Sequence, residues 1–515
     1  MSMDVIFGLS PLLSVALGAL LLMLAEAFGK PQSPEGLAAD GTVIDAGAGR
    51  AGELGLIAAV ILFAGAALSI GVWSAGPENL AGLKGVQPYL IMDRFTIFFC
   101  FVLCLGGALA ALLAGGYLTE HKIDRGEFFP LILLATVGAM ALAASGELLT
   151  LFVALETMSL GVYAMVGLRR NPRAAEAALK YFLLGSFAAA LMLFGAALLY
   201  GATGHTDLVG IGQAIRSVGK PGSNVAAAPI LIALVLTIAG LAFKVSAVPF
   251  HMWTPDAYEG APTPATSFMA VAVKAAAFAV MIRVLLVAFG DERLMSWASG
   301  WPPALALMAV LSMTVANLIA GRQSSVKRML AYSSIAHAGY ALVGVVAAMR
   351  SSMGEASVLF YMLTYAVSTA GAFGSLILCG SRGKEAVSYE DLAGIAKRHP
   401  SAALAFSLFL LSLAGIPPTA GFFGKLYVFQ AAIDSELYLL AVLGLVNSLI
   451  GAYYYLRVIV FMYMREPAPG AVTAEPMKSG YVASALVIAA VLVLALGVLP
   501  GAFLKMAGAA SVLGG

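Results

Sequence analysis

The chain is poor in charged residues and in cysteine, and each shortage excludes a class of function. Only 11% of its 515 residues are charged, against about 25% in soluble domains. Its formal charge of +2 is too small to indicate a nucleic-acid partner. The three cysteines, Cys100, Cys104 and Cys379, lie in apolar runs, without a CxxC motif or a Cys/His cluster. The sequence therefore carries no haem, iron–sulfur or zinc signature.

Apolar residues dominate the sequence instead. The hydrophobic fraction is 61%, and runs of about 20 apolar residues recur along the whole chain. The short alternating segments of a membrane β-barrel are missing. The pattern predicts an all-α polytopic membrane protein. Asp4 and no basic residue precede the first apolar run, so we expect that helix to be retained rather than cleaved as a signal peptide.

We predict about 14 transmembrane helices. Their approximate limits are Leu9–Phe28, Leu54–Ala75, Phe95–Gly115, Phe128–Ala144, Leu148–Leu168, Ala175–Tyr200, Pro229–Phe250, Thr263–Phe289, Pro302–Gly321, Val326–Ala348, Ser357–Gly380, Ala402–Ala432, Leu437–Met464 and Tyr481–Leu504.

The basic residues predict the orientation of these helices. Loops after odd-numbered helices hold sixteen Lys and Arg residues, and the loops and terminus on the opposite side hold six. By the positive-inside rule, the odd-numbered loops are cytoplasmic and both termini lie outside.

Two of the predicted helices are interrupted. Pro249 breaks the seventh one turn after Lys244, and Gly415, Pro417 and Pro418 interrupt the twelfth. The twelfth run, 402–432, would span roughly 46 Å as one helix, well beyond a hydrocarbon core of about 30 Å. Interrupted helices are tolerated in a membrane only where protein or water satisfies the freed backbone groups.

The two broken helices are five helices apart. A repeat of five helices reverses its orientation across the membrane, so helices 4–8 and 9–13 are predicted to form inverted repeats. The corresponding units are 1–127 (helices 1–3), 128–301 (first repeat), 302–464 (second repeat) and 465–515 (helix 14).

Of the ionisable residues inside predicted helices, four are the main candidates for a functional role. They are Glu156, Lys244, Lys274 and Lys425. An ammonium at the bilayer centre costs roughly 2.5–3.5 kcal/mol on insertion scales, a cost rarely kept without a use. Burial lowers the proton affinity of a lysine and a nearby carboxylate raises it. A pair formed by Glu156 and Lys244, with Lys274 and Lys425 as later stations, could therefore relay protons; a static buried ion pair is the structural alternative.

Two further residues are weaker candidates. Lys180 lies near the cytoplasmic start of the sixth helix, where a lysine can extend its ammonium to the membrane surface. His337 has a side chain suited to proton transfer near neutral pH, although a hydrogen-bonded packing role fits it nearly as well.

Three segments resemble one family. They are FKVSAVPFHMWTPDAYEGAPTP (243–264), KRMLAYSSIAHAGY (327–340) and AGIPPTAGFFGKLYVF (414–429). The chain resembles, over nearly its whole length, the antiporter-like membrane subunits of NADH–quinone oxidoreductase (respiratory complex I). EGAPTPAT, GFFGKLYVF and Lys425 favour the N type of this family over the L and M types.

The resemblance implies a function and a set of residues. It implies a proton-translocating, non-redox subunit that couples electron transfer from NADH to quinone to proton transfer. Glu156, Lys244, Lys274 and Lys425 match the family's proton-path residues. No cofactor is expected in this chain, because FMN and the iron–sulfur clusters of the family belong to partner subunits. The expected partners are other membrane subunits, including neighbouring antiporter-like ones, in the lipid bilayer of a bacterial inner membrane.

Two alternatives remain open at this stage. A subunit of a cation/proton antiporter or of a membrane-bound hydrogenase would share the fold. A solitary transporter of an organic solute is disfavoured, because the sequence contains no evident solute-pocket motif.

Overall fold

The computed structural model describes residues 3–28, 35–37, 43–45, 50–121, 123, 125–169, 171–380, 383–467 and 474–512. Within these residues, 12 helices are long and apolar enough to cross a membrane, and two shorter apolar helices, Phe128–Ala144 and Pro400–Ala414, accompany them. Each predicted span lies on one of these helices or on a helix that continues it. The prediction of an all-α membrane fold is confirmed, and the count of 14 crossings stays a prediction.

The helices of the first half follow each other with short connections. They are α1 (Met3–Gly8), α2 (Ser10–Ala27), α3 (Ala51–Ala75), η1 (Pro77–Asn79), η2 (Ala81–Val86), α4 (Arg94–Glu120), α5 (Phe128–Ala144), α6 (Leu148–Val166), α7 (Pro172–Thr203), α8 (Leu208–Ser217), α9 (Ala227–Val245), α10 (Thr254–Gly260), α11 (Thr263–Phe268), η3 (Met269–Val273), α12 (Lys274–Arg283) and η4 (Val284–Ala288). Strands β1 (Glu35–Leu37) and β2 (Val43–Asp45) pair antiparallel in the connection between α2 and α3.

The helices of the second half complete the bundle. They are α13 (Pro302–Ala320), α14 (Val326–Ala347), α15 (Ser352–Cys379), α16 (Ile395–Arg398), α17 (Pro400–Ala414), α18 (Ala420–Asp434), α19 (Tyr438–Met464), α20 (Gly480–Val498) and α21 (Pro500–Gly508).

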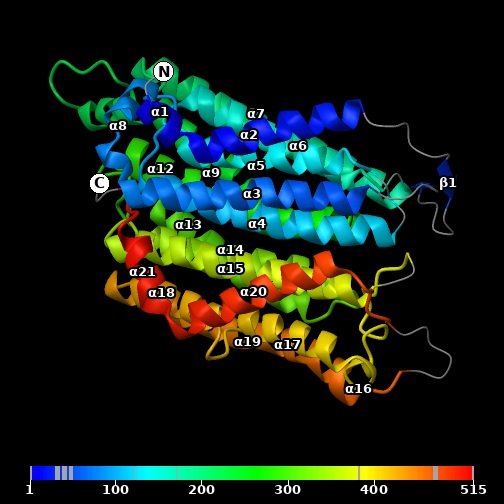
Figure 1. Cartoon of the computed structure of the whole chain (residues 1–515). Helices are drawn as coiled ribbons and strands as arrows, with labels where there is room; N and C mark the ends of the chain where they lie inside the picture. Colours follow the sequence, from blue (N-terminus) through cyan, green and yellow to red (C-terminus); the bar gives the residue numbers. More distant parts are fainter. Residues whose placement is uncertain are drawn as a thin grey trace.

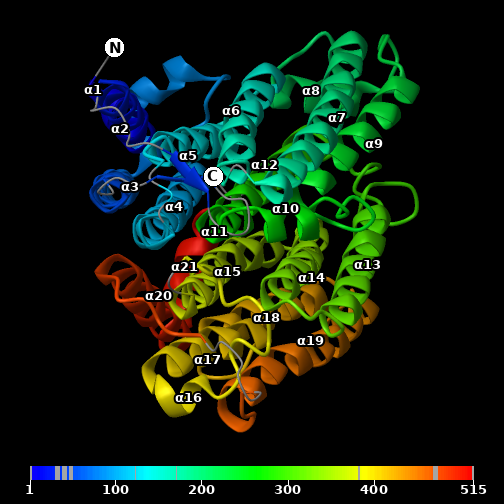
Figure 2. The ribbon, with the colours of Figure 1, turned by 90° about the vertical axis from the view of Figure 1, so that its right-hand side faces the viewer.

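The long helices run roughly side by side, and both ends of the chain lie at one end of the bundle (Figure 1). We call this the terminal end. The opposite end, on the right in Figure 1, carries α16 and the loops after the odd-numbered spans, and we call it the basic end. Seen from there, α6–α9 lie in the upper part of the view and α16–α19 in the lower part, with α10, α11, α14 and α15 between them (Figure 2). Of the sixteen basic residues counted in the loops after odd-numbered helices, Lys30, Lys122, Arg170 and Arg382 lie outside the described residues, as does Gly515.

The centre of the bundle is formed by four spans. In α4, α14, α15 and the span Thr263–Ala288, nearly every residue is buried, whereas α7, α19 and α20 bury only one face. A helix that is apolar on all sides belongs in the interior of a large membrane protein. Polar side chains on these central helices are therefore removed from lipid.

Both predicted breaks are present. The first falls earlier than Pro249: α9 ends at Val245, and Ser246 adopts a left-handed conformation (φ 64°). In the twelfth span, α17 ends at Ala414, Gly415 is left-handed (φ 85°), and α18 begins at Ala420. Proline restricts the residue before it to extended conformations, so neither helix could have continued through its proline.

The eighth span contains two π-helical turns that the sequence did not predict. They are η3 and η4, and they flank α12, which begins at Lys274. A π turn inserts a residue into the helical repeat and changes the direction of the side chains after it, and such turns occur frequently at functional sites.

Two isolated β-bridges lie at equivalent places in the predicted repeats. Each joins the loop before a repeat's second span to the loop after its third: Glu147 pairs with Asp207, and Ser325 pairs with Ser388. These equivalent contacts support the inverted repeat, which stays a prediction, as does the division at 127/128, 301/302 and 464/465. Each of these boundaries falls outside or at the end of a helix.

Candidate functional site

Lys244 lies on the last turn of α9, directly before the first break, and is almost completely buried. Its Nζ donates to Ser159 Oγ at 2.8 Å and to Tyr163 OH at 3.3 Å, both on α6. The same ammonium lies 5.5 Å from the centre of the Tyr163 ring. Neutral hydroxyls and a ring therefore surround this cation, and these groups can also accommodate an uncharged amine.

Glu156 does not form the direct pair with Lys244 that the sequence suggested. No ion pair between them is found among the described residues, and Glu156 Oε1 is buried without a hydrogen-bond partner there. Glu156, Ser159 and Tyr163 are spaced by three and four residues, so they lie on one face of α6. Ser159 and Tyr163 therefore make the contacts with Lys244, and Glu156 lies on the same helical face without contacting it.

Lys274 is also almost completely buried, at the start of α12. Its Nζ donates to the backbone carbonyl of Ser334 at 2.6 Å and to Ser334 Oγ at 2.9 Å. Ser334 belongs to α14, so this contact joins the first predicted repeat to the second.

His337 lies one turn further along α14, with both ring nitrogens in hydrogen bonds. Nδ1 is 2.7 Å from Tyr361 OH, and Nε2 is 3.0 Å from Tyr455 OH. Tyr455 OH also contacts Ser333 Oγ. The imidazole therefore links hydroxyls from α15 and α19, which is the geometry a proton-transferring histidine requires.

Lys425 lies beyond the second break in sequence, but its side chain turns back onto that break. Its Nζ donates to the carbonyl of Ala414, the last residue of α17, at 2.9 Å, and to Ser448 Oγ at 2.9 Å. Gly415 makes this approach possible, because a Cβ there would lie 3.0 Å from Lys425 Cδ. The ammonium lies 5.0 Å from the centre of the Tyr340 ring. Lys244 and Lys425 thus both end at a broken helix.

The face of α14 connects these stations. Ser334, His337 and Tyr340 follow each other at intervals of three residues, so they form one row on the helix. Ser334 binds Lys274, and Tyr340 lies beneath Lys425, while the rings of His337 and Tyr340 are 5.7 Å apart in an edge-to-face arrangement. A row of buried polar side chains on α14 therefore lies between the eighth span and the twelfth.

Lys180 lies apart from this line. Its side chain is 44% exposed and forms ion pairs with Glu176 at 2.7 Å and with Asp256 at 3.0 Å. Asp256, on α10, also pairs with Arg328 at 2.9 Å. The structure thus places Lys180 in a polar cluster at the basic end.

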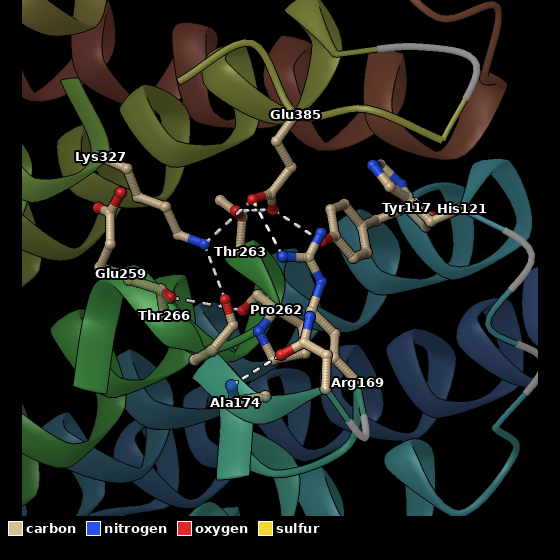
Figure 3. Close-up of polar contacts among 12 residues, drawn as sticks. Tyr117, His121, Arg169, Ala174, Glu259, Pro262, Thr263, Thr266, Lys327 and Glu385 are labelled. Carbon is tan, nitrogen blue, oxygen red and sulfur yellow. Dashed lines mark hydrogen bonds and ion pairs between the residues drawn. The ribbon is translucent and has the colours of Figure 1, made fainter. Parts of the chain in front are cut away.

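A second polar cluster near the basic end was not predicted from the sequence. Figure 3 shows Glu385, in the loop after α15, facing side chains from four other parts of the chain. Its carboxylate lies 3.3 Å from Arg169 and 3.4 Å from Lys327, and it accepts hydrogen bonds from Tyr117 and Thr263. Lys327 also donates to the carbonyl of residue 261, in the turn between α10 and α11, at 2.7 Å. Glu385 therefore ties α4, α11 and α14 together.

The charge of Glu385 is stabilised by its neighbours. Burial by itself disfavours the ionised form, but the positive charges of Arg169 and Lys327 outweigh this effect and hold the pKa of the Glu385 carboxyl well below its usual range. A group whose pKa is lower in the folded state stabilises the fold at any pH above its unfolded value, about 4.3 for glutamate.

Glu385→Gln should therefore destabilise the protein. The substitution leaves two cations near a neutral amide, and breaking a buried pair costs on the order of 3–5 kcal/mol. Thermal unfolding of the purified protein at neutral pH measures the loss, and the difference from the unmodified protein should stay constant down to about pH 4 and shrink only below it. Glu466→Gln is the control, since Glu466 pairs with Lys397 on the exposed surface. Equal melting temperatures for Glu385→Gln and the unmodified protein would contradict this role.

The comparisons with known proteins can now be set beside this geometry. The family model described as "NADH:quinone oxidoreductase/Mrp antiporter, TM" matches residues 145–451. NADH-quinone oxidoreductase subunit N 1 of Sorangium cellulosum (strain So ce56) is 66% identical over 506 residues, which cover 97% of each chain. The chain belongs to the NADH–quinone oxidoreductase subunit N family. Another relative, subunit N of Myxococcus xanthus (strain DK1622), is 40% identical over 529 residues, covering 96% of this chain and 95% of that one.

Solved structures agree with the family. A chain of respiratory complex I from Thermus thermophilus with bound aureothin matches with a TM-score of 0.75 and 35% identity, covering 96% of this chain and 98% of that one. A chain of the Mrp complex from Dietzia sp. DQ12-45-1b gives a TM-score of 0.81 at 21% identity, covering 99% and 97%. The second likeness shows only that the subunit N family shares its fold with that complex.

Proposed function

We propose that this chain is the antiporter-like subunit N of an NADH–quinone oxidoreductase, and that it moves protons through its buried lysines. Glu156, Lys244, Lys274, His337 and Lys425 are the stations of this path. Electron transfer and its cofactors, FMN and iron–sulfur clusters, belong to partner subunits in this proposal. The partners are other membrane subunits, including neighbouring antiporter-like ones. The chain itself takes part without redox chemistry.

The row of Ser334, His337 and Tyr340 on α14 is the observation that supports this proposal most. It brings one polar group to Lys274 and one aromatic face to Lys425, with a histidine between them. Buried charges kept only for packing would need no such alignment. A lysine can release its proton when its surroundings favour the neutral amine, and the hydroxyl partners of all three lysines permit this.

His337→Phe tests this row. Phenylalanine keeps a ring but removes both nitrogens, so proton transfer between Lys274 and Lys425 loses its central group. We expect proton pumping by the reconstituted complex to fall by roughly 100-fold, the lower end of the range for loss of an acid–base group. The measurement is the initial rate of acidification in proteoliposomes driven by NADH oxidation. Pumping at the unmodified rate by a fully assembled variant would exclude His337 from the path.

In the bacterial inner membrane, we propose that the basic end faces the cytoplasm and the terminal end faces outside. The excess of Lys and Arg at the basic end supports this orientation. Single cysteines at positions 384 and 505 test it, since Lys384 and Lys505 are exposed at opposite ends and the native cysteines are buried. In intact cells, an impermeant thiol reagent should label position 505 only. Labelling of position 384 alone would reverse the orientation.

A further inference from the structure

A polar cavity opens at the basic end between α7, α10 and the Glu385 cluster. Its volume is about 510 Å³, far more than the roughly 10–15 Å³ that one water molecule requires. Its rim is exposed at Arg173, Glu176 and Lys180. The other lining residues are Arg169, Asn171, Pro172, Ala177, Asp256, Glu259, Gly260, Arg328, Glu385 and Val387. The cavity can therefore hold water that exchanges with the solution at this end.

Tyr181 lies between this cavity and Lys244. It follows Lys180 directly and lies one helical turn after Ala177, which lines the cavity. Its ring stacks on Trp253 with centroids 4.2 Å apart, and the Trp253 indole donates to the carbonyl of Phe243 at 3.1 Å. The Tyr181 side chain is fully buried, and its hydroxyl has no hydrogen-bond partner among the described residues. A buried hydroxyl without a partner destabilises a fold, so its retention requires another explanation.

Tyr163 continues the line inward. Its ring meets that of Tyr181 edge to face, with centroids 4.7 Å apart, and its hydroxyl accepts the hydrogen bond from Lys244. Gly185, one turn after Tyr181 on α7, leaves room for this hydroxyl, because a Cβ at that position would lie 2.0 Å from Tyr163 OH. The glycine therefore allows the phenol to reach Lys244.

We propose that the hydroxyls of Tyr181 and Tyr163 form a proton relay that supplies Lys244 with protons from the polar cavity. Tyr181 OH has no hydrogen-bond partner among the described residues, so in this relay water bridges it to the cavity and to Tyr163 OH. Each hydroxyl accepts a proton on the side of the cavity and gives its own proton inward, Tyr181 through water and Tyr163 to the amine of Lys244. Both tyrosines are neutral again after the transfer, and Lys244 changes from amine to ammonium. The inference rests on the proposed function and adds two relay residues and the place of proton uptake to it.

Tyr181→Phe isolates the relay from the fold. The substitution removes one oxygen that has no partner and leaves the stacking on Trp253 in place, so the melting temperature should stay the same or rise. Proton pumping by the reconstituted complex should fall at least roughly fivefold, with a larger solvent isotope effect in D₂O. Tyr389→Phe is the matched control, because Tyr389 is also fully buried with an unpartnered hydroxyl among the described residues, but it packs against Phe461. This control should pump normally.

Tyr163→Phe and the double variant complete the test. The two hydroxyls act in series, so Tyr163→Phe should slow pumping comparably and the double variant should be no slower than the worse single variant. Normal pumping by Tyr181→Phe, while Lys244→Ala is inactive, would overturn the relay and leave the proposed function intact. Normal pumping by Lys244→Ala would instead overturn the proposed function itself.

Discussion

Replacing Lys244 by alanine is expected to reduce proton pumping and NADH-driven turnover to a small fraction of the unmodified level in a complex that still assembles. The amine of Lys244 becomes charged when it takes up a proton and neutral when it releases one, whereas Ser159 and Tyr163 contact it as neutral hydroxyls. Glu156→Ala should produce a similar loss, because the carboxylate favours the protonated lysine. The two losses should be less than additive, as both disable one unit.

Both variants and the double variant are measured as pumping rates in proteoliposomes, with the amount of assembled complex as the reference. Lys220→Ala is the control, because this lysine is exposed in the loop between α8 and α9. Fully additive losses would show that Glu156 and Lys244 act independently. Full pumping by an assembled Lys244→Ala complex would remove this lysine from the path.

The second large effect is expected at Lys425, where arginine distinguishes proton transfer from fixed charge. Lys425→Ala should abolish pumping, and Lys425→Arg should impair it severely, although arginine keeps the positive charge near Ala414 and Ser448. A guanidinium, with a pKa above 12, does not release its proton under any working condition. Pumping and quinone reduction are measured on the same preparation.

A purely structural cation would tolerate the substitution. Lys505→Arg, at an exposed lysine of the terminal end, provides the control for arginine itself. Normal pumping by an assembled Lys425→Arg complex would favour the structural role for Lys425.

The helices and their breaks could be predicted from the sequence because hydropathy and proline act locally. The break in the twelfth span was placed correctly between Gly415 and Pro418, since a run of that length could not remain one helix. The first break was placed at Pro249 but begins at Ser246, because the left-handed residue rather than the proline ends the helix. The π turns around Lys274 have no composition signal, and they depend on packing within the central spans.

The buried lysines could also be predicted, but their partners could not. A lone cation in an apolar run is visible in the sequence, whereas its partners are far away along the chain. Ser334 lies 60 residues from Lys274, and Tyr455 lies 118 residues from His337. Only Ser159 and Tyr163 had a local signal, because they share the helical face of Glu156 at intervals of three and four residues.

The partners of Glu385 at the basic end could not be predicted from the sequence either. Glu385 lies in a loop with other charged residues, and its environment arises from Tyr117, Arg169, Thr263 and Lys327, which are distant in sequence. A loop carboxylate is normally solvated, and nothing in the sequence marks Glu385 as an exception. Tertiary packing makes it a largely buried anion instead.

The ratio of protons translocated to NADH oxidised tests the central claim most directly. It is measured in proteoliposomes that contain the assembled complex with both Lys244→Ala and Lys425→Ala. If protons pass along the line from Lys244 through Lys274 and His337 to Lys425, the ratio should fall below the unmodified value or turnover should stop with pumping. An unchanged ratio at unmodified turnover would contradict the account.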